Sequence, residues 1–531
     1  MDQELSVRAP SGEDRRRFLG FLTGIAVFTV VLALPPVDSF QETAARLIHT
    51  GGADVSPDQL ATSMRAVLAV MGLMVVWWVT EAVPLPVTAL VPVALLPLLR
   101  IEGVSGGGTV ELTLGTVARN YANPVIFLFL GGFLIAGAMR KWGLDRRLTL
   151  WLLSRGTLAY DARKILFALM VVTSVLSMWI SNTATAALML PLGLGVLSLM
   201  GEQPGSSRFG TAVMLGIGWA ASVGGMGTII GTPPNGIALG ILNTVLADDP
   251  GYHRITFLDW MKFGVPYVIL FLPVVWFLLI KLFPPASLRI EGGKEHLLAE
   301  YRALGRLSRG EKRTVAVFLL AAALWVGLPL REEVLPAAVA EQFAWFDEYS
   351  VGIFAGLLMF LLPVNVRRGE FVLTWSDTKY VEWGILILFG GGIALSDALF
   401  KTGLASWFAS SFVAVFGSPS TIVLMFVVVF LVDFLTEITS NTAVTSMIVP
   451  IIISIALETG QSPVALTLAA ALAGSMAFML PVATPPNAIV YSSGYIRLKD
   501  MIRAGFALDM LGWLFTVGVV LLFAGTIFGL L

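Results

Sequence analysis

The chain has 531 residues, of which 56% are hydrophobic and 13% are charged, and its formal net charge is −1. This composition excludes an ordinary soluble globular protein, and the near-neutral charge gives no reason to expect a nucleic-acid partner. Apolar runs long enough to cross a ~30 Å hydrocarbon layer recur along the whole length, so we predict an all-α polytopic membrane protein. The chain has no cysteine, which excludes disulfides and thiolate metal sites. It has three histidines, which leave little basis for a Ser-His-Asp triad.

Lys and Arg residues in short loops predict the orientation of the first half, because such loops lie on the cytoplasmic side. Arg15 to Arg17 predict a cytoplasmic N-terminus, and the following apolar run has no small-residue cleavage site, so it is expected to stay as a helix. Further spans are expected near 63–80, 82–99 and 124–140. The apolar stretch 165–199 is interrupted by "SNT" and has basic sequence on both sides. It is therefore expected to form a hairpin that enters and leaves on one side.

The second half repeats this scheme after a basic connector. Spans near 209–248 and 264–281 lead into the connector, and spans at 313–330, at 350–364 and from 382 follow it. The acidic stretch 332–348 is expected outside. The segment 421–458, with the second "SNT", then has to enter from outside so that Arg497, Lys499 and Arg503 lie inside. The C-terminus is predicted to end outside.

The two halves are an internal duplication. "LFLGGFLIAGAMRKWGL" from Leu128 aligns without a gap with "LFGGGIALSDALFKTGL" from Leu388, and "GTPPNGI" from Gly231 matches "ATPPNAI" from Ala483. The first copy enters from inside and the second from outside, so the repeats are inverted, as is typical of secondary transporters. We predict an inverted-repeat transporter with two re-entrant helical hairpins, two broken helices and about 11 transmembrane helices.

The repeated motifs have a physical use in a membrane. Each "SNT" is expected to begin a half-helix, whose free N–H groups and positive dipole end attract an anion. A plain pair of helix caps is the alternative, and the duplication disfavours it. In "TPPN" two prolines break the helix and free carbonyl oxygens for a monovalent cation, although a proline kink is possible for either copy alone. Ser177 and Thr436 stand four residues before the two triplets, which suggests two matched cation sites that each combine a hydroxyl, the Asn and a carbonyl.

The "SNT" pair, the "TPPN" pair and "WWVTEAVPLPVTALVP" at 77–92 resemble the divalent anion:sodium symporter family, also called solute carrier family 13, from about residue 63 to the C-terminus. The resemblance implies a transport domain that moves like an elevator against a dimeric scaffold. It further implies a multi-pass protein of the inner (plasma) membrane, with sodium as coupling ion and no other cofactor. On this basis residues 1–62 form the N-terminus, first helix and outer loop, 63–164 and 313–420 are scaffold, 282–312 is the cytoplasmic connector, and 165–281 and 421–531 form the transport domain.

The resemblance also implies the site residues, carried over position by position. The first sodium site would comprise Ser177, Ser181, Asn182 and Gly231, and the second Thr436, Thr439, Asn441 and Ala483. Substrate contacts would be Ser181, Asn182, Thr183, Ser440, Asn441 and Thr442, with Thr232, Thr484 and Pro485 at the rim.

The leading hypothesis is a sodium-coupled symporter of C4-type dicarboxylates such as succinate, malate and fumarate. A sodium-independent dicarboxylate exchanger, or a carrier of sulfate or citrate, is the alternative within this class. A membrane enzyme would need a nucleophile beside a base, and the hydroxyls of the motifs have no His or Lys nearby; a channel is a third possibility. Asp433 and Glu437, one turn apart before the second "SNT", are either functional carboxylates or a water-facing pair at the mouth of the hairpin.

Overall fold

The structure of the protein is a computed structural model, and it describes residues 12–528 apart from 52, 155–160, 288–292, 335, 337, 338, 340, 341 and 344. The predicted connector 282–312, the predicted outer loop 332–348 and both chain ends therefore lie partly outside the described residues. Nearly all described elements are helices, with two short β-hairpins. Ten helices in the described part of the chain are long and apolar enough to cross a membrane.

The first part of the chain forms α1 (Gly12–Ala33), α2 (Asp38–Gly51), α3 (Pro57–Thr80), α4 (Leu85–Thr88), α5 (Val91–Leu98), β1 (Glu102–Ser105), β2 (Gly108–Glu111), α6 (Leu114–Ala118), α7 (Pro124–Lys141) and α8 (Leu144–Leu153). The elements that follow are α9 (Ala162–Ser177), α10 (Asn182–Leu199), α11 (Arg208–Gly225), η3 (Ile229–Gly231), α12 (Pro233–Val245), α13 (Phe257–Leu282), α14 (Gly293–Ala303), α15 (Arg309–Gly327) and α16 (Arg331–Val334). The last part forms α18 (Glu348–Leu361), β3 (Pro363–Asn365), β4 (Glu370–Phe371), η6 (Trp375–Tyr380), α19 (Trp383–Thr402), α20 (Leu404–Phe416), α21 (Thr421–Ile438), α22 (Asn441–Glu458), α23 (Pro463–Ala473), α24 (Pro485–Tyr491) and α25 (Leu498–Phe528).

The chain divides into two compact units. One contains the residues up to Tyr121 together with Ile387–Gly417. Within this unit α1 packs along α3, and the ring of Phe21 stacks on Trp77 with centroids 5.4 Å apart. The other unit contains Ala122–Leu386 and Ser418–Leu531, and both "SNT" and both "TPPN" motifs lie in it.

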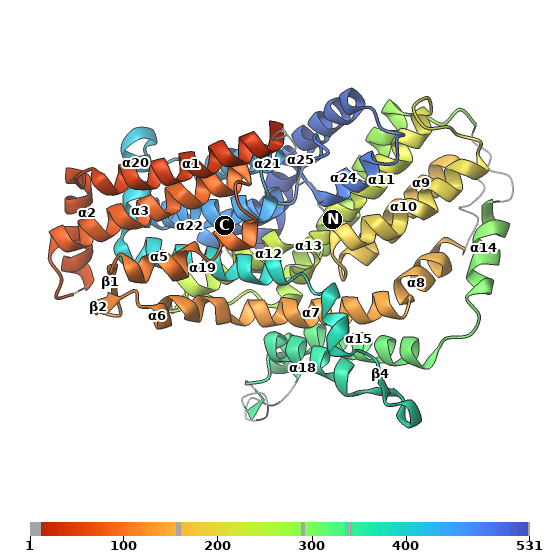
Figure 1. Cartoon of the computed structure of the whole chain (residues 1–531), viewed down its shortest axis with the longest axis horizontal. Coiled ribbons are helices and arrows are strands. Elements are labelled where there is room, and N and C mark those ends of the chain that lie inside the picture. Colours follow the sequence, from red (N-terminus) through yellow and green to blue (C-terminus); the bar gives the residue numbers. More distant parts are fainter. Residues whose placement is uncertain are drawn as a thin grey trace, which may run out of the picture. The chain divides into compact units, whose positions relative to one another are not determined.

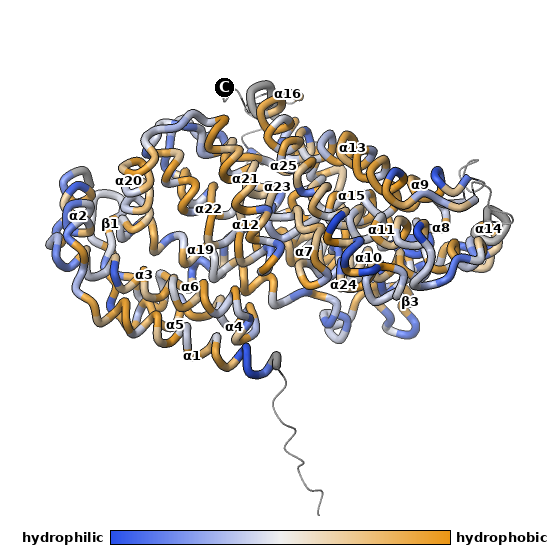
Figure 2. Tube along the Cα trace, turned by 90° about the horizontal axis from the view of Figure 1, so that it is seen from above, coloured by the Kyte–Doolittle hydropathy of each residue, from blue (hydrophilic) through white to orange (hydrophobic). Residues whose placement is uncertain are grey.

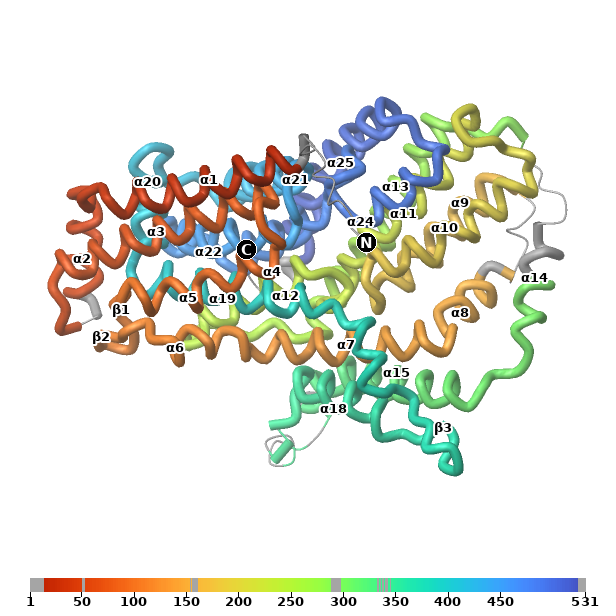
Figure 3. Tube along the Cα trace, viewed as in Figure 1, coloured from red at the N-terminus to blue at the C-terminus, as the bar shows by residue number. Residues whose placement is uncertain are grey.

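The second unit contains the same set of elements twice. Helices α9 and α10 meet at the first "SNT", and α11 and α12 are the halves of a broken helix that α13 follows; α21 to α25 repeat this order. The second half of each broken helix packs on the other repeat: α12 contacts α22 and α23, while α24 contacts α10 and α11. Figure 1 shows α24, in blue, beside α10 and α11, in yellow and green. The trace in Figure 3 shows that α10 and α24 come from distant parts of the chain.

Local sequence explains where these helices begin. Ser56 with Gln59, and Thr256 with Asp259, form capping boxes at the starts of α3 and α13. Prolines open α7, α12, α23 and α24 at positions where a helix needs no N–H donor. The prolines of "TPPN" therefore begin the second half of each broken helix. Figure 2 shows the apolar run of α13, in orange, which has the composition of a membrane-spanning helix.

Glycines permit close backbone contact at two positions, Gly131 and Gly391. A Cβ atom on Gly131 would lie 2.0 Å from the carbonyl oxygen of Gly352, where α7 crosses α18. A Cβ atom on Gly391 would lie 2.3 Å from the carbonyl oxygen of Ala89. Neither position has room for a larger residue, because the neighbouring atoms belong to backbone.

Candidate functional site

The first "SNT" triplet lies at the turn between α9 and α10. Ser177 ends α9, and its hydroxyl donates to the carbonyl oxygen of Ala221 on α11 at 2.7 Å. The amide of Asn182, the first residue of α10, lies 2.7 Å from the same hydroxyl. It also lies 3.0 Å from the carbonyl oxygen of Ala221 and 3.3 Å from that of Gly231. Three of the four predicted residues of the first sodium site, Ser177, Asn182 and Gly231, are thus together, and Ser181 is adjacent in the chain.

This set of groups is chemically unusual because one end of the Asn182 amide faces three oxygen atoms, those of Ser177, Ala221 and Gly231. With its nitrogen turned inward, the amide donates to the Ser177 hydroxyl and to the carbonyls of Ala221 and Gly231. With its oxygen turned inward, four oxygen atoms converge and none of them is a carboxylate. Oxygen atoms of this kind, from hydroxyl, amide and unwound backbone, are the ligands that monovalent cations use in transporters. The orientation of such an amide follows from what it faces, so a bound cation would select the second arrangement.

The second "SNT" triplet is arranged differently. The hydroxyl of Thr436 donates to the carbonyl oxygens of Asp433 at 2.7 Å and Met476 at 3.0 Å. The amide oxygen of Asn441 is buried and accepts no hydrogen bond. Among the described residues, no hydrogen bond joins Thr436 or Asn441 to Ala483, although Ala483 and Thr439 are both buried. An unsatisfied buried acceptor is costly, and a cation would satisfy it.

The four helices that begin at these motifs differ in their caps. Ser181 accepts from the backbone N–H of Ala184 at 3.4 Å, and Thr484 accepts from that of Asn487 at 3.3 Å, so α10 and α24 are capped. Ser440 and Thr232 make no such bond, so α22 and α12, which pack together, begin without a side-chain cap. The first N–H groups of α22 are therefore uncapped, whereas α12 begins with two prolines, which have no N–H. Ser181 thus caps its helix, and Ser440 makes no capping bond. The other predicted substrate residues are half-buried Thr183, buried Thr442 and exposed Pro485.

The asparagines of "TPPN" are functional candidates that we did not predict. The side-chain amide of Asn235 donates to the carbonyls of Gly225 at 3.1 Å and Thr228 at 2.8 Å. Asn487 donates in the same way to Ala477 at 2.8 Å and Leu480 at 3.0 Å. Both side chains are completely buried. The signal that could have found them is the recurrence of Asn after both proline pairs.

Asp433 and Glu437 do not form a water-facing pair. Their exposed fractions are 0% and 2%, and Asp509 on α25, which sequence reasoning missed, is 1% exposed and interacts with both. Glu437 accepts from the backbone N–H groups of Met479 at 2.7 Å and Leu480 at 3.0 Å, in the break between α23 and α24. The packing of α21 against α23 and α25 buries this side of the helix, so the water-facing alternative is wrong. The sequence could not predict that Asp509 meets them, because a contact between helices that lie far apart in the chain leaves no local sequence pattern.

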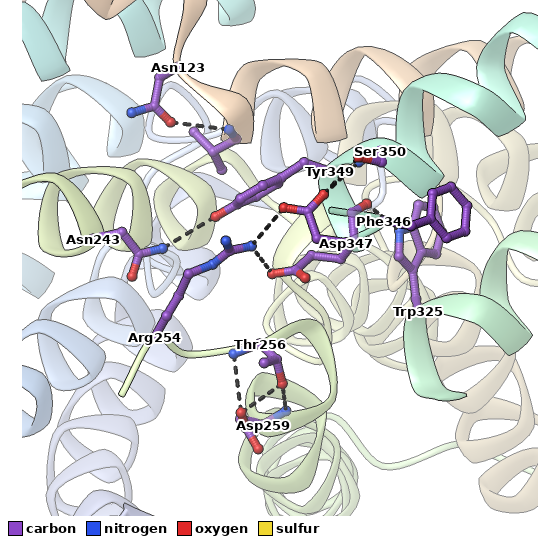
Figure 4. Close-up of polar contacts among 12 residues, drawn as sticks. Asn123, Asn243, Arg254, Thr256, Asp259, Trp325, Phe346, Asp347, Tyr349 and Ser350 are labelled. Carbon is purple, nitrogen blue, oxygen red and sulfur yellow. Dashed lines mark hydrogen bonds and ion pairs between the residues drawn. The ribbon is translucent and has the colours of Figure 1, made fainter. Parts of the chain in front are cut away.

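A polar cluster surrounds Arg254, in the segment between α12 and α13 (Figure 4). Its guanidinium pairs with Glu348 at 2.5 Å and Asp347 at 3.5 Å and lies 4.2 Å from the ring centroid of Tyr349. Asn243 of α12 donates to the hydroxyl of Tyr349 at 3.3 Å. Burial raises the pKa of Tyr252, whose protonated hydroxyl donates to Asn243. A cavity of 510 Å³ adjoins the cluster and is lined by Tyr252, His253, Arg254, Gln461 and Ser462 among others.

Among the described residues, no group of three or more histidine or acidic side chains could hold a metal ion. The polar groups at the motifs are hydroxyls, amides and backbone, and they lie in breaks within apolar helices of two repeats. The fold and these breaks define a helical membrane transporter of the inverted-repeat class. The chain belongs to the family described as "Sodium:sulfate symporter transmembrane region", which matches residues 55–530.

The chain is similar to known dicarboxylate transporters over most of their length. The chain is 35% identical over 485 residues to the sodium-dependent dicarboxylate transporter SdcS of Staphylococcus saprophyticus, covering 89% of each chain. It is 35% identical over 465 residues to SdcS of Staphylococcus aureus, covering 86% of this chain and 85% of the relative.

Two solved structures resemble the fold. The YdaH transporter of Alcanivorax borkumensis has a TM-score of 0.55 at 15% identity, covering 87% of this chain and 98% of that one. MtrF of Neisseria gonorrhoeae has a TM-score of 0.53 at 13% identity, covering 86% and 96%. At this identity the likeness concerns the fold alone.

Proposed function

We propose that the protein is a secondary active transporter that carries a C4-type dicarboxylate, such as succinate, malate or fumarate, together with sodium. The observation that carries this proposal is the set of oxygen atoms around the Asn182 amide, from Ser177, Ala221 and Gly231. The names of the SdcS relatives support the substrate class and the coupling ion.

Electrostatics gives the reason for coupling. No Lys or Arg lies in either "SNT" or "TPPN" motif, and two half-helix ends supply only about one unit of positive charge. A doubly charged anion left uncompensated in an apolar site costs several kcal/mol, so the missing charge has to come with the substrate. Sodium at the Asn182 and Asn441 sites would supply it. By linkage, sodium then tightens succinate binding and succinate tightens sodium binding.

Uptake of labelled succinate into proteoliposomes tests the proposal. An inward sodium gradient should drive accumulation, and replacement of sodium by choline should abolish it. Thr436→Val, which removes one predicted ligand, should raise the sodium concentration for half-maximal uptake. Equal uptake in sodium and choline would favour the sodium-independent exchanger, and uptake of sulfate or citrate instead of succinate would change the substrate.

The mechanism, assembly and orientation complete the proposal. The hairpins and broken helices would move as an elevator against the scaffold helices in a homodimer in the plasma membrane, and no chemical step is required of the protein. The N-terminus would be cytoplasmic and the C-terminus outside, because the basic and acidic loops alternate in that sense. The chain has no cysteine, so single cysteines introduced at Arg306 and Arg331 should be labelled by an impermeant reagent only from the cytoplasm and only from outside, respectively.

A further inference from the structure

The broken helices of the two repeats are closed by the same side-chain contact. In the first, Asn235 donates to the carbonyls that stand ten and seven residues earlier, at Gly225 and Thr228. In the second, Asn487 donates to the carbonyls that stand ten and seven residues earlier, at Ala477 and Leu480. Asn235 therefore ties α12 to the last residue of α11 and to the turn between the halves, and Asn487 ties α24 to two residues of the break between α23 and α24.

This contact answers a need that the break in the helix creates. Because α11 ends at Gly225 and α12 begins at Pro233, the carbonyls of Gly225 and Thr228 lack the donors that a continuous helix would supply four residues later. A buried carbonyl without a donor costs roughly 1–3 kcal/mol, and one Asn side chain supplies two donors. Both repeats use the same residue type, bind carbonyls at the same two positions and bury the side chain completely. This repetition indicates a shared role in addition to packing.

Two of the predicted cation ligands, Gly231 and Ala483, lie in the segments whose ends these Asn contacts join. Gly231 lies between Thr228 and Asn235, and its N–H donates to the Thr228 carbonyl at 3.3 Å. Ala483 lies between Leu480 and Asn487, and its N–H donates to the Leu480 carbonyl at 3.2 Å. The Asn amide and this N–H thus meet at one carbonyl. They fix the turn from which the carbonyl of Gly231, or of Ala483, projects.

We propose that Asn235 and Asn487 are positioning residues for the two sodium sites, each of which aims the backbone carbonyl of its own break at the cation. This inference rests on the proposed function and deepens it. Each amide nitrogen donates to two carbonyls and is therefore not a cation ligand, while each amide oxygen is buried and accepts no hydrogen bond. The proposed action is through the turns that carry Gly231 and Ala483, which the two amides hold in place. Loss of the contact leaves a more mobile carbonyl, which weakens sodium binding more than it changes substrate contacts.

Two substitutions separate positioning from packing. Asn→Asp keeps the shape but turns an oxygen toward the two carbonyl oxygens, and Asn→Leu keeps the volume without donors. In proteoliposomes each change, at Asn235 or at Asn487, should raise the sodium concentration for half-maximal succinate uptake at least about tenfold, which corresponds to about 1.4 kcal/mol. Maximal rate should recover at high sodium. Asn243→Leu, on the same helix α12 but in the Arg254 cluster, is the matched control and should leave sodium affinity unchanged.

A second readout is independent of transport. Val482 precedes Ala483 and is 85% exposed, so Val482→Cys gives the cysteine-free chain one reporter for maleimide labelling in detergent. Sodium should slow labelling of this variant, and Asn487→Asp in the same background should need about ten times more sodium for the same protection. If Asn487→Asp does not fold, by size-exclusion chromatography, Asn487→Leu takes its place.

The outcomes are distinguishable. If sodium slows labelling equally well with and without the Asn487 change, and uptake by the Asn235 and Asn487 variants keeps the parent sodium affinity, the positioning inference is overturned while sodium coupling stands. A lower maximal rate with unchanged sodium affinity would also overturn it, because that pattern belongs to a residue needed only for folding. If sodium neither slows labelling of the Val482→Cys variant nor drives uptake by the parent protein, the proposed function itself fails.

Discussion

The carboxylate of Glu437 accepts a hydrogen bond of 3.0 Å from the backbone N–H of Leu480, and this bond joins the second hairpin to the second break. In the first repeat the residues at the same positions, Met178 and Thr228, are joined in the same direction but by other groups: the Thr228 hydroxyl donates to the backbone carbonyl of Met178. The joint between hairpin and break is thus present in both repeats, but only the second uses a carboxylate. The two predicted cation sites therefore differ in their surroundings despite their shared origin.

The contact between Gly225 and Asn182 leads to a prediction for the first cation site. A Cβ atom at position 225 would lie 2.5 Å from the Asn182 amide oxygen, so Gly225→Ala should push this amide away from Ser177 and Gly231. We expect the sodium concentration for half-maximal succinate uptake to rise at least about tenfold. Gly195→Ala, in α10 with no atom within 4 Å of the added methyl group, is the control. Equal sodium affinity in the two variants would contradict the assignment of Asn182.

The two "SNT" asparagines should each be indispensable. Asn182→Ala and Asn441→Ala remove one predicted cation ligand and one predicted substrate contact at once, and neither removes a large apolar surface. Each variant should elute as folded protein in detergent and show no sodium-driven succinate uptake above the background of empty liposomes. Near-normal uptake in either variant would contradict the proposed role of that asparagine.

The ion pair between Arg254 and Glu348 should stabilise the fold. Glu348 is 8% exposed in its side chain whereas Arg254 is 40% exposed, so the effect should lie between that of a buried pair and that of a surface pair, at roughly 2 kcal/mol. Arg254→Ala should lower the unfolding temperature in detergent, and adding Glu348→Gln should restore part of it, because the more buried of the two carboxylates that Arg254 pairs with is then no longer charged. A double variant no more stable than Arg254→Ala would exclude this coupling.

Asp377 gives a pH-dependent prediction. Its burial raises the pKa, but the hydrogen bonds from Lys141 at 2.8 Å and from the backbone and hydroxyl of Thr374 outweigh burial and leave the pKa lowered. A lowered pKa in the folded state stabilises the protein at neutral pH, and this contribution is lost as the pH falls through the folded-state pKa.

We therefore expect Asp377→Asn to lower the free energy of unfolding at pH 7 by roughly 1–3 kcal/mol. The difference between parent and variant should shrink in acid below about pH 4, where the ordinary carboxyl is protonated in the unfolded chain. Thermal unfolding in detergent at the two pH values measures this. A difference that is the same at both pH values would mean that the charge of Asp377 does not contribute.

The amino-acid sequence by itself determined the class of protein, the duplication and the position of both motifs. These features can be predicted from sequence because the length of apolar segments, the basic loops and the repeated motifs are local properties of the chain. Helices α12 and α24 begin at the prolines of their "TPPN" motifs. These starting points also follow from the sequence, because proline has no N–H and interrupts a helix.

Only the tertiary structure decided which groups meet. Asp509 reaches Glu437 from another helix, and the Glu437 carboxylate binds amides 42 and 43 residues away. Whether Asp433 faces water or the interior depended on the packing of α23 and α25 against α21. The contacts of Asn235 and Asn487 with carbonyls seven and ten residues earlier likewise depend on how the chain folds back at each break. Contacts of this kind depend on how distant segments pack, and neighbouring residues in the sequence carry no record of them.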